Sequence, residues 1–146
     1  MERSPALDPE HWEHFPHGAD IGVRGRAPTL EGAFQQAALA LTAVVVEPES
    51  LDPSDVVEIS CEAPDAELLL VDWLNALIYE MATRQMLFGR FEVHIQGPRL
   101  RAKVWGQPID LDGQELAVEP KGATYTALSV RQVADGTWVA ECVVDV

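Results

Sequence analysis

Apolar side chains recur at two different spacings along this chain, and the two spacings predict two kinds of element. From Leu30 to Val44 they recur every three or four residues, which is the pattern of one face of an α-helix. Thr29 precedes this stretch as an N-cap, so we expect the helix to begin there. A second helix is predicted from Asp65 to about Thr83. Its apolar positions cover most of its circumference, so we expect it to be buried and to form the core.

Alternation of apolar and polar residues predicts β-strands over most of the remaining chain. The predicted strands cover residues 12–15, 21–26, 56–61, 87–96, 100–104, one or two segments within 118–133, and 138–144. A turn is expected over His17–Gly22, another at Gly97-Pro98, an acidic one over Pro108–Gly113, and a hairpin at Asp135-Gly136. The order β-α-β-α followed by antiparallel strands is typical of an α+β fold, a two-layer sandwich of two helices packed on a mostly antiparallel sheet.

A single domain is expected from the length of 146 residues. Residues 1–10 are polar and contain proline, so we expect a disordered leader, with the domain spanning residues 11–146. No apolar stretch has the length of a signal-sequence core or a membrane span. The two cysteines, Cys61 and Cys142, are far apart in β-like segments and are interpreted as buried thiols. These features predict a cytoplasmic protein with no membrane partner.

The charge is strongly acidic, with 10 Lys and Arg against 24 Asp and Glu and a formal net charge of −14. Such a surface repels polyanions, so direct nucleic-acid binding is not expected. It suits a basic protein partner, a cation, or solubility alone. One predicted strand departs from this trend, because Arg99, Arg101 and Lys103 share one face, which we interpret as a solvated strand face.

Candidate chemistry lies at the two ends of the chain. Asp20 follows an apolar residue and precedes another, and a buried carboxylate of this kind needs a partner. His14, His17 and Asp20 have a spacing at which they could share a ligand, although each histidine is better explained by a hydrogen bond to the main chain. Asp145 precedes Val146, which places a side-chain carboxylate beside a terminal one. If Asp20 joins them, three oxygen groups suit Ca²⁺ or Mg²⁺, whereas a solvated terminus is the simpler alternative.

Several short motifs, taken together, identify a known family. They are His17-Gly18-Ala19-Asp20-Ile21-Gly22, Thr29-Leu30-Glu31 with Ala33-Phe34 and Ala37-Ala38, Leu68-Leu69 with Asp72-Trp73-Leu74, Leu87-Phe88 with Phe91, Lys121-Gly122-Ala123-Thr124-Tyr125, and Asp145-Val146. With these motifs the chain resembles the archease family from Trp12 to Val146. The resemblance implies the archease fold and a non-enzymatic activator of the RtcB-type RNA ligase. That activator promotes guanylylation and multiple turnover of the ligase in tRNA splicing and RNA repair.

The resemblance also implies specific residues. By position, a divalent metal is expected at Asp20, Asp145 and Val146, with calcium expected first and magnesium or zinc as alternatives. His17, Lys121 and Asp72 are expected to contact the ligase or to lie near the metal, although Lys121 is equally well explained as a surface lysine.

Two residues depart from the family motifs. Gly18 stands where the family has threonine, which removes a hydroxyl from the loop, and Thr126 stands where histidine is common. The altered loop predicts a different geometry or affinity at the metal site, and Thr126 weakens any role assigned to its position.

Two other functions remain as alternatives. A metal-dependent phosphohydrolase or nucleotidase would use the same oxygen ligands, with His17 as a base. A general chaperone is the third reading. No phosphate-binding glycine loop, paired zinc cysteines or nucleophile elbow is present in the sequence, so a catalytic function is the less favoured hypothesis.

Overall fold

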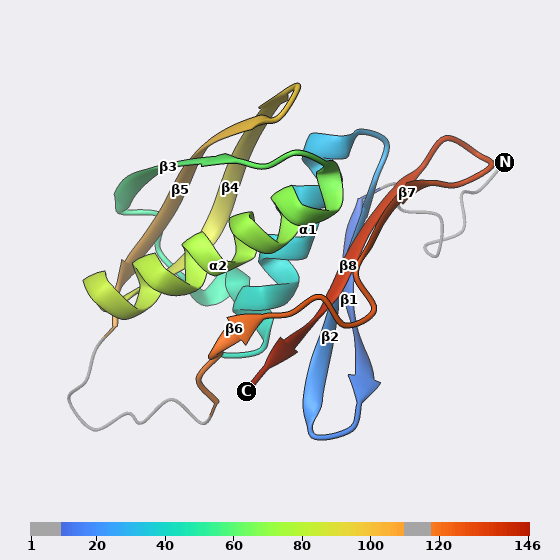
Figure 1. Cartoon of the computed structure of the whole chain (residues 1–146). Helices are drawn as coiled ribbons and strands as arrows, with labels where there is room; N and C mark the ends of the chain where they lie inside the picture. The colour runs from blue at the N-terminus through green and yellow to red at the C-terminus, as the bar shows by residue number, and fades with distance from the viewer. Residues whose placement is uncertain (1–9, 110–117) are drawn as a thin grey trace, which may run out of the picture.

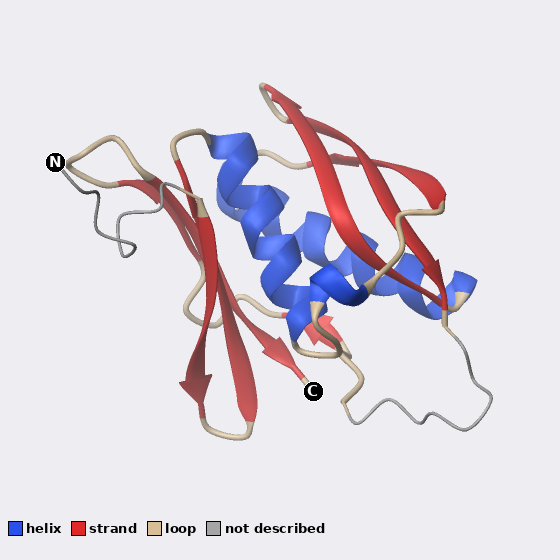
Figure 2. Cartoon of the chain, turned by 180° about the vertical axis from the view of Figure 1, so that it is seen from behind, coloured by secondary structure: helices blue, strands red, loops and turns tan. Residues whose placement is uncertain are grey.

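The computed structural model describes residues 10–109 and 118–146. Two helices lie between two antiparallel sheets, as Figures 1 and 2 show from opposite sides. The predicted leader falls almost entirely on residues 1–9 and the predicted acidic turn mostly on residues 110–113, so both lie outside the described residues.

The first sheet, called sheet A, joins the two ends of the described chain. Its strand order is β1-β2-β8-β6, with β7 also paired to β8. The strands are β1 (His11–His17), β2 (Asp20–Ala27), β6 (Gly122–Ala123), β7 (Ser129–Gln132) and β8 (Trp138–Asp145). Because β8 pairs with β2, a strand from the C-terminal end of the sequence lies at the centre of a sheet that begins near the N-terminus.

The second sheet, called sheet B, comes from the middle of the chain and has the order β3-β5-β4. Its strands are β3 (Asp55–Glu62), β4 (Met86–Gln96) and β5 (Arg99–Pro108). The turn between β4 and β5 contains Gly97 at φ +59°, in the left-handed region that glycine adopts without strain.

Both helices begin at capping residues that the sequence indicates. In α1 (Leu30–Ala43) the hydroxyl of Thr29 accepts a hydrogen bond from the Gly32 amide at 3.0 Å. In α2 (Ala66–Arg84) the carboxylate of Asp65 accepts one from the Leu68 amide at 2.8 Å. These bonds satisfy amides that the first helical turn leaves without a partner. A short 3₁₀ helix, η2 (Pro48–Ser50), lies between α1 and β3.

The core lies around the helices. Phe34 of α1 and Trp73 of α2 are fully buried, and the indole nitrogen of Trp73 donates a hydrogen bond to the main-chain oxygen of Phe34 at 3.1 Å. Helix α1 packs closely on β2 because Gly25 has no side chain. A Cβ at Gly25 would overlap main-chain atoms of Ala33 and Ala37.

The predicted α+β class is confirmed, with two helices packed on antiparallel strands. The strands are divided between two sheets rather than gathered in one, and the helices fill the space between them (Figure 2). The turn predicted over His17–Gly22 is wrong in extent, because only Gly18 and Ala19 separate β1 from β2. Among the described residues, no helix is both long and apolar enough to span a membrane.

Candidate functional site

The β1–β2 hairpin places two of the candidate residues directly across from each other. His17, the last residue of β1, pairs with Asp20, the first residue of β2. Gly18 between them has φ +60°, a conformation that a threonine, the family residue at this position, would adopt only with strain. Gly18 therefore suits the sharp two-residue turn that brings His17 and Asp20 together.

The end of β8 lies against the same hairpin. The antiparallel register pairs Ile21 with Val144, so Asp20 and Asp145 occupy the next positions along their strands. The Val146 amide donates a hydrogen bond to Oδ1 of Asp20 at 3.4 Å, between residues 126 positions apart in the chain. The structure thus brings Asp20, Asp145 and Val146 to one end of sheet A, which we call the tip.

Lys121 reaches the tip from the other side of β8. Its amide donates a hydrogen bond to the main-chain oxygen of Asp145 at 2.8 Å, just before the short strand β6. Asn75 of α2 holds β6 in place, because its side chain accepts a bond from the Ala123 amide at 2.8 Å and donates one to the Ala123 oxygen at 3.4 Å. Asn75 lies within the predicted second helix, where nothing in the sequence marks it as a contact of a distant strand. The long-range pairing that gives it this role has no local signal.

The carboxylates at the tip have no cationic partner among the described residues. Ion pairs within residues 10–109 and 118–146 involve neither Asp20 nor Asp145, and none involves Lys121. Asp20 is half-buried and Asp145 is exposed. Two carboxylates at neighbouring positions of a ladder repel each other, so the tip favours a cation from outside the chain.

The donor chemistry of the tip fits a hard cation, since carboxylate oxygens are the ligands that Ca²⁺ and Mg²⁺ prefer. In the part of the chain that the structure describes, no three His, Cys, Asp or Glu side chains are arranged to hold a metal ion. The expected ligand set contains only two such side chains, Asp20 and Asp145, and its third member is the main-chain carboxylate of Val146. Metal binding at the tip therefore stays a prediction.

His14 does not belong to the tip, so the cluster of His14, His17 and Asp20 does not form. Nε2 of His14 lies 2.7 Å from the main-chain oxygen of Ala40 in α1, on the face of sheet A that packs against the helix. Since side chains alternate between the two faces of a strand, His14 and His17 point in opposite directions. The interpretation that each histidine bonds the main chain is correct for His14.

Two residues singled out by the sequence, Asp72 and Thr126, form no hydrogen bond or ion pair with the three residues of the tip in the described part of the chain. Asp72 is exposed on α2, and its charge contributes, after burial, to raising the pKa of the Cys61 thiol to about 11. Thr126 accepts a hydrogen bond from the Val143 amide through its main-chain oxygen at 3.1 Å, and its side chain is exposed.

Neither cysteine offers a nucleophile at neutral pH. Burial raises the pKa of Cys61 to about 11 and that of Cys142 to about 12, so both thiols stay protonated. Both are free rather than joined in a disulfide, and Cys142 is buried as the sequence predicted, whereas Cys61 is only half-buried.

A charge network further along the strands that carry the tip was not predicted. Glu141, only 7% exposed within β8, accepts hydrogen bonds from Arg24 at 2.9 Å and from Arg131 at 2.6 Å. Glu13 of β1 accepts bonds from Arg24 at 3.2 Å and from Arg26 at 3.1 Å. The network joins β1, β2, β7 and β8, and so holds together the strands that carry the tip. The sequence offered one sign of this network, because Glu141 is a carboxylate within an otherwise apolar strand.

Comparisons with known proteins agree on one family. The archease protein family (MTH1598/TM1083) matches residues 12–146. The chain is 36% identical over 141 residues to protein archease of Pyrococcus abyssi, covering 94% of this chain and 99% of that protein.

Solved structures show the same fold. The solution structure of Methanobacterium thermoautotrophicum protein 1598 superposes with a TM-score of 0.81 at 28% identity, covering 92% of this chain and 98% of that one. The crystal structure of an archease from Thermotoga maritima, described as a possible chaperone, shares the fold with a TM-score of 0.58 at 17% identity, covering 100% of this chain and 98% of that one. The resemblance found in the sequence motifs is confirmed, and the chain belongs to the archease family.

Proposed function

We propose that this protein is a non-enzymatic activator of the RtcB-type RNA ligase in tRNA splicing and RNA repair. Membership of the archease family supports the proposal, since the family's motifs imply this role. The observation that carries it is the hydrogen bond between Val146 and Asp20, which joins two motifs from opposite ends of the chain. The N-terminal motif that contains Asp20 and the C-terminal motif Asp145-Val146 therefore lie together at one site.

In this proposal the tip binds a divalent cation. Calcium is expected first, with magnesium or zinc as alternatives. Asp20, Asp145 and the terminal carboxylate of Val146 are its proposed ligands. When bound, the cation supplies positive charge that offsets the repulsion between these carboxylates and fixes the ends of β2 and β8. His17 and Lys121 lie beside these residues and are the proposed contacts with the ligase. Asp72 of α2 is the third proposed ligase contact.

The chain's own residues would act by presenting a fixed shape to the ligase. The charge network of Glu141 and its arginines and the anchor from Asn75 hold the strands around the tip. The net charge of −14 favours approach to a basic protein, and a protein that binds RNA carries basic surfaces. The acidic charge also argues against a mechanism in which this protein grips the RNA itself.

The test is a ligation assay with an RtcB-type ligase and RNA that carries a 3′-phosphate or 2′,3′-cyclic phosphate end. With RNA in excess over ligase, added protein is expected to raise the number of turnovers and the fraction of guanylylated ligase. Equal product with and without the protein would refute the proposal.

The two alternatives are separated by assays without the ligase. Incubation of the pure protein with nucleotides and phosphoesters is expected to give no product, whereas turnover would favour the phosphohydrolase. The Thermotoga maritima protein, which shares this fold, is described as a possible chaperone. Suppressed aggregation of unrelated proteins, without ligase stimulation, would favour that function.

A further inference from the structure

Tyr125 is the most exposed large hydrophobic side chain among the described residues. It is 70% exposed, against 65% for Tyr79 and 54% for Val56. In the described part of the chain its ring contacts no aromatic or cationic side chain, and its hydroxyl forms no hydrogen bond. A ring that buries so little area contributes little to folding, so its role is to be sought outside the fold.

The main chain on both sides of Tyr125 is hydrogen-bonded to one residue of β8. The amide and the hydroxyl of Thr124 each donate a hydrogen bond to the main-chain oxygen of Val143 at 2.9 Å. The Val143 amide donates one to the main-chain oxygen of Thr126 at 3.1 Å. The Thr126 amide in turn donates one to the Thr124 hydroxyl at 3.2 Å. Tyr125 therefore lies on a short loop whose main chain is fixed on either side of it.

The same loop holds one residue in an uncommon conformation. Ala127 has φ +54°, in the left-handed region that alanine adopts only with strain. The turn closes with a hydrogen bond from the Leu128 amide to the main-chain oxygen of Tyr125 at 3.3 Å. Strained conformations persist where the surrounding contacts enforce them, and they are concentrated at binding and catalytic sites. The strain and the exposed ring together indicate a loop that serves binding.

This loop lies beside the tip. Residues 121–126 run along the end of β8, with Lys121 hydrogen-bonded to Asp145 at one end and Tyr125 beside Val143 at the other. Val143 and Asp145 are two positions apart on a strand, which is about 7 Å. Figure 1 shows β6 and the loop that follows it alongside the end of β8. Tyr125 thus extends the surface that contains the proposed metal ligands and Lys121.

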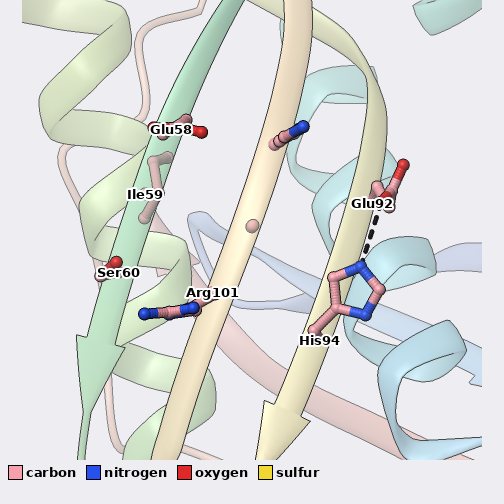
Figure 3. A pocket seen from close by; sticks show the side chains of 8 residues that line it. Glu58, Ile59, Ser60, Glu92, His94 and Arg101 are labelled. Atoms are coloured by element: carbon pink, nitrogen blue, oxygen red, sulfur yellow. Dashed lines mark hydrogen bonds and ion pairs between the residues drawn. The ribbon is translucent and has the colours of Figure 1, made fainter.

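A second charged surface lies on sheet B, and its charges do not suit a basic partner. A hollow of about 470 Å³ there is lined by Arg101 and Lys103 of β5, by Glu58 of β3, and by Glu92 and His94 of β4. Figure 3 shows Arg101 extending from the middle strand, while the carboxylate of Glu92 is engaged by His94 at 3.0 Å. A basic partner would meet Arg101 and Lys103 here, and like charges repel. The carboxylates of the tip attract such a partner instead.

We propose that the ring of Tyr125 packs against a basic side chain of the ligase when the tip docks, an inference that rests on the proposed function. The face of an aromatic ring attracts cations, and a protein that binds RNA carries arginine and lysine on its surface. The carboxylates of the tip attract the same basic surface, so the two contacts act together. Tyrosine is enriched among residues that dominate interface energies, and a side chain on a fixed loop loses little freedom on binding.

The test is the dissociation constant of the complex with an RtcB-type ligase, measured by isothermal titration calorimetry in the presence of calcium. Tyr125→Ser removes the ring, and Tyr125→Leu keeps an apolar side chain without a ring. Both are expected to raise the dissociation constant by about fivefold or more. Tyr125→Phe keeps the ring and is expected to bind within about twofold of wild type.

Tyr79→Ser is the matched control, since it removes an exposed tyrosine that lies on α2, outside this loop. Arg101→Ser tests the surface on sheet B, and both control variants are expected to bind the ligase as wild type does. Circular dichroism and the melting temperature, with and without calcium, establish that the Tyr125 variants keep the fold and the calcium response.

Wild-type affinity in Tyr125→Ser, while wild type still stimulates the ligase, overturns this inference and leaves the proposed function intact. Wild type that neither binds nor stimulates the ligase overturns both. Wild-type affinity in Tyr125→Leu alone would show that the ring is not needed, which also overturns the inference. If Tyr125→Ser instead loses affinity only for a fluorescent RNA oligonucleotide in the absence of ligase, the ring stacks on a base and the inference is overturned in favour of RNA binding.

Discussion

The amide of Val146 donates a hydrogen bond to Oδ1 of Asp20 at 3.4 Å, although the two residues are 126 positions apart. The bond lies just beyond the β2–β8 ladder, where β2 begins at Asp20 and β8 ends at Asp145. The tip therefore gathers negative charge at a point that the fold holds fixed. This arrangement costs stability unless a cation binds there.

The first prediction is that neutralising one tip carboxylate has opposite effects with and without calcium. Asp145→Asn removes repulsion from Asp20, so the metal-free variant is expected to be more stable than wild type by up to about 1 kcal/mol. Calcium is expected to raise the melting temperature of wild type, because it binds only the folded state, and to leave that of the variant unchanged. Differential scanning calorimetry with EDTA or with CaCl₂ measures both effects.

The control for this prediction is Asp52→Asn, an exposed aspartate in the loop before β3. It is expected to keep the calcium response of wild type. If Asp145→Asn also keeps that response, calcium does not bind at the tip.

The second prediction concerns the buried carboxylate of the charge network. Glu141→Gln loses the charge that accepts hydrogen bonds from Arg24 and Arg131, and it is expected to reduce the free energy of unfolding by about 1–3 kcal/mol. Urea denaturation at pH 7 measures the change. Glu62→Gln breaks an exposed ion pair with Arg99 and is expected to change the free energy by less than about 1 kcal/mol. Equal effects of the two substitutions would show that the network adds no stability.

The third prediction is the pH dependence of that network. Burial alone raises the pKa of Glu141, but hydrogen bonds from Arg24 and Arg131 outweigh it and hold the pKa below its ordinary value of 4.5. The pKa of Glu13 is lowered against burial in the same way, by Arg26 and Arg24. A carboxylate with a lowered folded-state pKa stabilises the protein above its unfolded-state pKa. That stability is lost as the pH falls through the folded-state pKa.

Urea denaturation between pH 7 and pH 3 tests this sign. Wild type is expected to lose stability below about pH 4.5, and Glu141→Gln is expected to lose less over the same interval. A variant whose stability falls as steeply as that of wild type would assign the acid sensitivity to other groups.

The fourth prediction compares two glycines in sheet A. A methyl group at Gly25 would overlap main-chain atoms of α1, so Gly25→Ala is expected to cost about 3 kcal/mol or more, or to prevent folding. At Gly122 the nearest atom to an added Cβ is Oδ1 of Asn75 at 3.6 Å, which is ordinary contact. Gly122→Ala is therefore expected to change stability by less than about 0.5 kcal/mol. Similar melting temperatures for the two variants would contradict the close packing of α1 on β2.

Local features of the sequence predicted the helices well. Thr29 and Asp65 cap their helices because a capping bond spans only three residues, and the apolar spacing of each helix is equally local. The separation of the strands into two sheets could not be predicted, because β2 pairs with β8 across more than a hundred residues. Strand alternation predicts which residues share a face, and not which strand lies beside them.

The candidate site was predictable only in part, for the same reason. Asp20 and Asp145 emerged from the motifs, and the structure brings them together. Alternation along β1 separates His14 from His17, but the sequence placed His14 in a predicted strand and His17 in a predicted turn, so it did not show that both lie on one strand. Glu141 lay in a predicted strand, yet its partners Arg24 and Arg131 depend on the long-range register.

The most direct test of the account is multiple-turnover RNA ligation by an RtcB-type ligase with wild-type protein, Asp20→Asn or Asp145→Asn, in the presence of calcium. Wild type is expected to stimulate ligation. Each variant is expected to lose at least tenfold of that stimulation while remaining folded, and Asp52→Asn is expected to match wild type. Full stimulation by Asp20→Asn and Asp145→Asn would contradict the claim that the joined ends of the chain form the activating site.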